Sequence, residues 1–98
     1  MFIMANQFKI GKGNTTVAAT NGVTLVTFHQ TVVVSFDQKI ITLNSGGWLT
    51  ATTKTRINQT ANQFDLGFNV YQDKGKWFVK FNNETIPFAD NMTFERRN

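Results

Sequence analysis

Short runs of alternating hydrophobic and polar residues dominate the chain, and their period is that of β-strands. The clearest run covers residues 23–28 and follows the turn dipeptide Asn21-Gly22; the next two cover residues 31–36 and 39–43. Only two residues separate neighbouring runs, so we predict three consecutive strands of a β-meander. The middle run contains Val32-Val33-Val34, and this β-branched stretch predicts a strand covered on both faces.

A second set of alternating runs follows at residues 68–72, 77–81 and 84–88. The intervening segments contain residues that tolerate positive φ, Asp-Lys-Gly-Lys at 73–76 and Asn-Asn at 82–83, as tight hairpin turns require. Pro87 has no backbone N–H to donate, so the last of these runs is predicted to be an edge or terminal strand.

Residues 44–67 interrupt the strand pattern. After the glycine-rich stretch Asn44-Ser-Gly-Gly-Trp48, the apolar residues Ile57, Ala61 and Phe64 have the spacing of one helical face. A threonine at position 50, 52 or 53 can cap the start of a helix, and Gly67 can follow its end. Many residues between them are poor helix formers. We therefore predict one helix within residues 50–65, with an ordered loop as the alternative.

The length of 98 residues fits one domain, 1–98, with its core at about 23–88. Phe8 and Ile10 alternate with polar residues, but Gly11-Lys-Gly13 breaks that pattern, and the tail 91–98 is expected to be loosely held. Five or six short strands, a bent meander and one short helix predict an all-β fold, a small antiparallel barrel.

Composition narrows the functions that the chain can have. It has no cysteine, which excludes a disulfide framework and a thiolate metal site. Ten Lys and Arg against six Asp and Glu give a formal net charge of +4, and the pI is about 9.8. This excess favours a polyanionic partner, although it also fits an ordinary soluble domain. No apolar run has the length of an export signal or a membrane span, so we expect no membrane partner.

The sequence contains no recognisable catalytic or metal-binding motif. His29 is the only histidine and lies between two predicted strands, which is typical of a turn residue. No nucleophile elbow surrounds Ser35 or Ser45, and Asp37 and Asp73 fall in predicted turns. We therefore expect neither an enzyme nor a bound cofactor or metal.

Binding is the better-supported class of function, because basic residues recur beside aromatic and amide side chains. Lysine and arginine neutralise phosphates, aromatic faces stack on bases, and amides bond to base edges. The alternative is that Trp77 belongs to the core and the neighbouring lysines form a solvated hairpin tip. The candidate nucleic-acid-binding residues are Trp48, Lys54, Arg56, Asn58, Gln59, Lys74, Lys76 and Trp77.

Three blocks of sequence also resemble a family of small proteins from marine cyanophages and ocean metagenomes. They are Thr31-Val-Val-Val-Ser-Phe-Asp37, Ile41-Thr-Leu-Asn-Ser-Gly-Gly-Trp48, and Thr50-Ala-Thr-Thr-Lys-Thr-Arg56 through Phe64, with Trp77-Phe-Val79 beyond them. The resemblance implies an Sm-like fold, a strongly bent barrel that forms rings by edge-strand pairing. The Sm signature motifs themselves are absent from the sequence, so no binding residue is carried over from that fold.

The resemblance implies a homo-oligomeric ring that binds RNA or single-stranded DNA in the host cytoplasm during phage infection. Its expected seams are the strand Ile86-Pro-Phe88 and an apolar strand such as 32–34. The alternative is a structural virion component or adaptor with no nucleic-acid role, which would also explain a surface rich in Thr and Asn.

Overall fold

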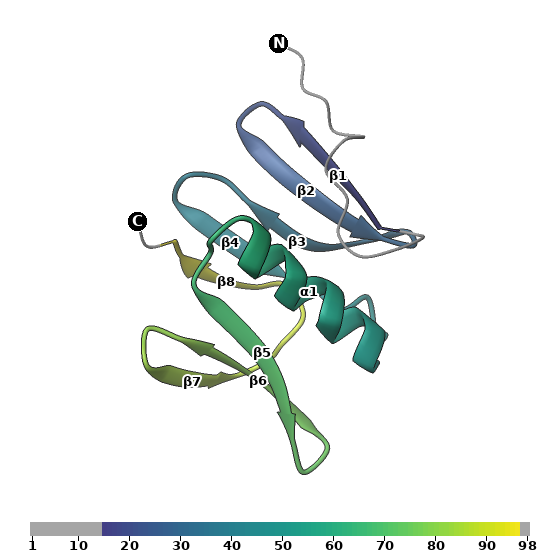
Figure 1. Cartoon of the computed structure of the whole chain (residues 1–98), viewed down its shortest axis with the longest axis vertical. Helices are drawn as coiled ribbons and strands as arrows, with labels where there is room; N and C mark the ends of the chain where they lie inside the picture. The colour runs from purple at the N-terminus through teal and green to yellow at the C-terminus, as the bar shows by residue number, and fades with distance from the viewer. Residues whose placement is uncertain (1–14, 97–98) are drawn as a thin grey trace.

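Two antiparallel sheets and one helix make up the part of the chain that the structure, a computed structural model, describes: residues 15–96 (Figure 1). The five-stranded sheet has the order β1-β2-β3-β4-β8, and the three-stranded sheet the order β5-β6-β7. The elements are β1 (Thr15–Thr20), β2 (Val23–Phe28), β3 (Thr31–Phe36), β4 (Ile40–Leu43), α1 (Ala51–Gln63), β5 (Phe68–Asp73), β6 (Lys76–Phe81), β7 (Glu84–Pro87) and β8 (Met92–Glu95).

Two of the predicted turns join the strands of hairpins. Asn21 and Gly22 join β1 to β2 with φ values of 54° and 81°, and Asn82 and Asn83 join β6 to β7 with 57° and 65°. Two successive positive φ angles give the turn twist that matches paired strands. The predicted meander of residues 23–43 is confirmed, with β2 paired to β3 and β3 paired to β4.

Helix α1 confirms the helical interpretation of residues 50–65 over the ordered loop. The Thr50 hydroxyl accepts a hydrogen bond from the Thr53 N–H at 3.2 Å, which caps the first turn. At the other end Asp65, not glycine, takes the left-handed position with φ 56°, and the Leu66 N–H bonds to the Ala61 carbonyl at 2.9 Å. The helix packs mainly on β5 and also on β2 and β3.

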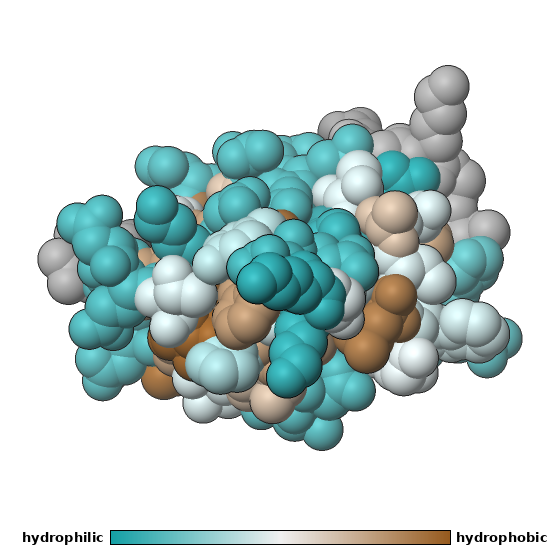
Figure 2. All heavy atoms as spheres, turned by 90° about the horizontal axis from the view of Figure 1, so that it is seen from below, coloured by the Kyte–Doolittle hydropathy of each residue, from teal (hydrophilic) through white to brown (hydrophobic). Residues whose placement is uncertain are grey.

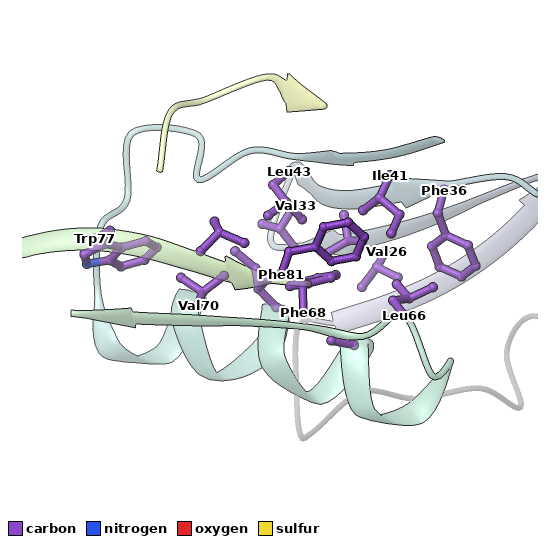
Figure 3. Close-up of a cluster of buried hydrophobic side chains, with 14 of the residues drawn as sticks. Val26, Val33, Phe36, Ile41, Leu43, Leu66, Phe68, Val70, Trp77 and Phe81 are labelled. Atoms are coloured by element: carbon purple, nitrogen blue, oxygen red, sulfur yellow. The ribbon is translucent and has the colours of Figure 1, made fainter. Parts of the chain in front are cut away.

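One hydrophobic core lies between the helix and the sheets, and Figure 3 shows its side chains. Phe94 of β8 joins the two sheets, because its ring centroid lies 5.6 Å from that of Phe68 and 4.7 Å from that of Phe81. The core residues are Val17, Val26, Val33, Val34, Phe36, Ile41, Leu43, Ile57, Ala61, Leu66, Phe68, Val70, Trp77, Val79 and Phe81.

The mostly β prediction is confirmed, but neither sheet closes into a barrel among residues 15–96. Two edges that could have joined the sheets are occupied. The outer edge of β4 pairs with β8, and the side chain of Asn58 bonds to both backbone groups of Val70 on the outer edge of β5. The described residues form eight strands, rather than five or six, in two separate sheets.

The prediction of a loosely held tail at 91–98 is wrong for residues 92–95. They form β8 along the whole of β4, from Ile40 opposite Glu95 to Leu43 opposite Met92. The Arg96 N–H continues the pairing to the Lys39 carbonyl at 2.7 Å, and the Arg96 guanidinium donates to the Asp37 carbonyl at 2.9 Å. Phe8, Ile10 and Gly11-Lys-Gly13 lie outside the described residues.

The valine run of β3 is neither covered on both faces nor placed at a sheet edge. A register shift opposite Val26 and Thr27 leaves Val33 as an extra residue, so that Val33 and Val34 are both buried while Val32 is partly exposed. Strand β3 lies between β2 and β4, so it cannot be the predicted assembly seam. Strand β7, which contains Ile86, is an edge of the three-stranded sheet, as Pro87 predicted.

Candidate nucleic-acid interface

The loop of residues 44–49, which we call the Trp48 loop, is fixed by hydrogen bonds although it lies on the surface. The N–H and the hydroxyl of buried Ser45 both donate to Asp90 Oδ1, at 2.8 and 2.7 Å. The Ser45 hydroxyl also accepts from the Gly47 N–H at 3.1 Å, and the Ser45 carbonyl from the Trp48 N–H at 3.0 Å. These bonds hold the backbone that carries Trp48.

Gly46 brings the Trp48 loop against the start of β3. A Cβ atom on Gly46 would overlap Thr31 Oγ1 and would lie 2.7 Å from Thr31 Cγ2. Both Gly46 and Gly47 also have positive φ, 65° and 84°. A side chain at position 46 would therefore force the loop away from the β2–β3 turn.

Trp48 and Leu49 are the most exposed large apolar side chains of the described residues, with 65% and 59% of their surface accessible. Two clefts adjoin them. One, of about 770 Å³, is lined by His29, Gln30, Thr31 and Trp48. The other, of about 470 Å³, is lined by Leu49, Gly75, Lys76, Trp77, Phe78, Pro87 and Phe88. Figure 2, which views the molecule from the end where the β5–β6 hairpin lies, shows hydrophobic patches separated by hydrophilic side chains.

Lys54 places a positive charge beside the second cleft. From the first turn of α1, its ammonium donates to Gln72 Oε1 on β5 at 3.1 Å and lies 5.6 Å from the centroid of the Trp77 ring. Trp77 is only 7% exposed and packs edge-on against Phe88, with centroids 5.2 Å apart. Trp77 therefore belongs to the core, as Figure 3 shows at one end of the cluster, and offers no free face to a base.

Lys74 and Lys76 extend the basic surface onto the β5–β6 hairpin. Lys74 has a φ of 53° in the turn and Lys76 begins β6 opposite Asp73, and both lysine side chains are exposed. The cleft lined by Lys76 is also lined by Leu49, the neighbour of Trp48. Four of the predicted site residues, Trp48, Lys54, Lys74 and Lys76, thus lie at one end of the molecule.

Arg56 and Gln59 lie on another side of the helix and contact each other. The Arg56 guanidinium donates to Gln59 Oε1 at 3.1 Å and lies 5.9 Å from the centroid of the Phe28 ring on β2. Residues two apart on a helix are rotated by about 200°, so Lys54 faces β5 while Arg56 faces β2. The structure does not bring Lys54 and Arg56 together in one phosphate site.

The amide of Asn58 bonds to the protein backbone. Its Oδ1 accepts from the Val70 N–H at 2.7 Å, and its Nδ2 donates to the Val70 carbonyl at 2.8 Å. The side chain thereby occupies the two hydrogen-bonding positions that a neighbouring strand would fill on β5. Asn58 has a structural role in this arrangement and its amide is engaged away from solvent partners.

Sequence reasoning missed Gln30, Thr31 and Leu49, which line the two clefts beside Trp48. Nothing in the local pattern indicated them, because the β2–β3 turn and the Trp48 loop come together only in the fold, where Gly46 lies close to Thr31. Among residues 15–96 no group of three or more His, Asp or Glu side chains could hold a metal ion. No helix in this range is long and apolar enough to cross a membrane.

Comparisons with known proteins give one family. The sequence model of the Kyanoviridae Gp96 protein matches residues 1–95. No curated protein and no solved structure matches the chain significantly. The predicted origin in a cyanophage family is confirmed, whereas the Sm-like fold that the resemblance implied finds no support. Since the match covers nearly the whole chain, the protein belongs to the Kyanoviridae Gp96 family of cyanophage proteins.

Proposed function

We propose that the protein binds single-stranded nucleic acid, RNA in first place, at the end of the molecule that carries Trp48, Lys54, Lys74 and Lys76. One observation carries the proposal: Trp48 is 65% exposed although the loop beneath it is fixed by hydrogen bonds. Stability does not require an exposed indole, and a rigid aromatic face is what base stacking uses.

The charges around Trp48 support an anionic partner. Lys54 lies beside the second cleft, Lys76 lines it, and Lys74 is at the tip of the same hairpin; Asp73 opposite Lys76 is the acidic residue of this turn. Three lysines around an aromatic platform are the pattern of proteins that track a single strand without reading its sequence. The net charge of +4 acts in the same direction.

Self-association belongs to the same proposal. The outer edge of β5 is capped by Asn58, whereas the outer edge of β7 pairs with no described strand. The outer edges of β1 and β8 are also open among the described residues, so a ring would form by pairing β7 of one copy with one of these edges on the next copy. Light scattering of the purified protein tests this step: a monomer at all concentrations would refute it without touching the proposal on nucleic acid. The site of action would be the host cytoplasm during infection.

Binding to labelled single-stranded oligonucleotides across a salt series tests the proposal. Each phosphate neutralised contributes a slope of about −0.7 to the plot of log affinity against log salt. The double variant Lys74→Gln, Lys76→Gln should flatten that slope by about 1.4, whereas Trp48→Ala should weaken binding by about 5- to 150-fold at every salt concentration. The matched control is Lys39→Gln, Lys80→Gln, which removes two exposed lysines elsewhere.

The outcomes separate the two functions considered for this chain. No binding of the folded wild type at low salt would reject the nucleic-acid proposal and favour a structural role in the virion. Equal loss in the test and control variants would show that net charge, not this surface, holds the strand.

A further inference from the structure

The cleft beside Trp48 that faces the β2–β3 turn differs chemically from the basic surface. Its described lining residues are His29, Gln30, Thr31 and Trp48, and none of them is Lys, Arg, Asp or Glu. Its volume of about 770 Å³ is within the range of small-molecule sites in proteins, and it is open to solvent on one side. A phosphate would find no cation in this lining, whereas a neutral planar ring would find both an aromatic wall and polar groups.

Both walls of the cleft are held in place. On one side, Ser45 ties the Trp48 loop to Asp90 by two hydrogen bonds. On the other, His29 has a φ of 58°, rare for a residue with a side chain, and its ring lies against Phe28 with centroids 4.3 Å apart. Gly46 then sets the distance between the walls through its contact with Thr31. The cleft is thus a built feature of the fold.

The polar groups suit one edge of a base. A glutamine amide presents a donor and an acceptor side by side, which matches the adjacent N6 amino group and ring nitrogen of adenine. The exposed indole of Trp48 supplies the stacking face, and the Thr31 hydroxyl can donate or accept. Cytosine has the same pair in its N4 amino group and N3, and uracil has the reversed pair, so the amide can bond to any of these bases and a preference comes from the larger stacking area of a purine.

We propose that this cleft holds one nucleobase of the bound strand, stacked on Trp48 and hydrogen-bonded by Gln30, with adenine preferred for its larger ring. The inference rests on the proposed function, since the lysines hold the strand and the cleft gives it a base preference.

Fluorescence anisotropy with labelled oligo-A, oligo-U and oligo-C at one salt concentration tests the inference. The wild type should bind oligo-A about 5-fold more tightly than oligo-U or oligo-C, because a purine covers more of the Trp48 ring. Gln30→Ala should weaken the binding of all three oligonucleotides by about 2- to 12-fold, the range of one lost hydrogen bond. The matched control is Gln38→Ala, the same change at an exposed glutamine in the β3–β4 turn.

Two results would overturn the base pocket alone. One is a wild type that binds oligo-A, oligo-U and oligo-C equally. The other is a Gln30→Ala variant that binds the oligonucleotides as tightly as Gln38→Ala does, since Gln30 would then make no contact with the base. A wild type that binds no oligonucleotide would overturn the proposed function and the pocket together.

Discussion

Replacing Asn58 by alanine should destabilise the protein strongly, because two hydrogen bonds to the backbone of Val70 are lost at once. The N–H and the carbonyl of Val70 would both lose their partner, and Val70 is a buried residue. An orphaned backbone group costs about 1–3 kcal/mol when water replaces the partner poorly. The site is part-buried, so we expect a total loss of about 2–4 kcal/mol, a large share of the roughly 5–15 kcal/mol that stabilises a domain of this size.

Urea denaturation followed by circular dichroism measures this loss. With a slope of about 1 kcal/mol per molar urea, the midpoint should fall by about 2 M or more. The matched control is Asn62→Ala, the same change at an exposed position one turn further along α1, which should leave the midpoint nearly unchanged. A loss below about 0.5 kcal/mol in Asn58→Ala would refute the reasoning, because that is the ordinary spread of surface substitutions.

The variant Asn58→Asp separates the hydrogen bonds from the shape of the side chain. At neutral pH one carboxylate oxygen can still accept from the Val70 N–H, but the other would face the Val70 carbonyl, which also only accepts. Protonation of the carboxyl restores a donor toward that carbonyl. Relative to Asn58→Ala, the Asp variant should therefore gain stability as the pH falls, and a difference that does not change with pH would contradict the bonding scheme.

Two further substitutions test the loop and turn geometry. Gly46→Ala should lower the free energy of unfolding by about 1–3 kcal/mol more than Gly47→Ala does. Both substitutions change a residue with positive φ, but only a Cβ at position 46 would meet Thr31. Equal urea midpoints for the two variants would show that the contact is absent. Backbone N–H groups of Ile40 and Lys39 bond to the Asp37 carboxylate and hold its pKa below the ordinary value of 3.8. The ionised Asp37 carboxylate therefore contributes fully to the stability of the fold above pH 3.8, and this contribution is lost as the pH falls through the lower pKa of the folded state. The urea midpoints of the wild type and Asp37→Asn should differ at neutral pH and converge in strong acid.

Local rules predicted the elements whose signals are short-range. Asn21-Gly22 and Asn82-Asn83 specified tight turns by their tolerance of positive φ, and the spacing of Ile57 and Ala61 specified the buried face of α1. The Asn21-Gly22 turn also required a partner strand before it, so β1 could have been inferred from the turn even though Thr15–Thr20 is only weakly apolar.

Tertiary contacts decided what the sequence could not show. Lys54 and Arg56 are close in sequence, yet helical rotation sends one to Gln72 and the other toward Phe28. Asn58 was assigned to nucleic acid because amides bind bases, but its partner is the backbone of a strand twelve residues later. Periodicity carries no information about such contacts between elements.

The position of β8 has a consequence for how the chain is made. The partner strand of β4 is encoded about half a chain later, and Phe94 can contact Phe68 and Phe81 only after that segment has been made. Pairings so distant in sequence raise the contact order and slow folding. The five-stranded sheet can therefore be completed only once residues 92–95 have left the ribosome, and until then β4 exposes an unpaired edge to other nascent chains.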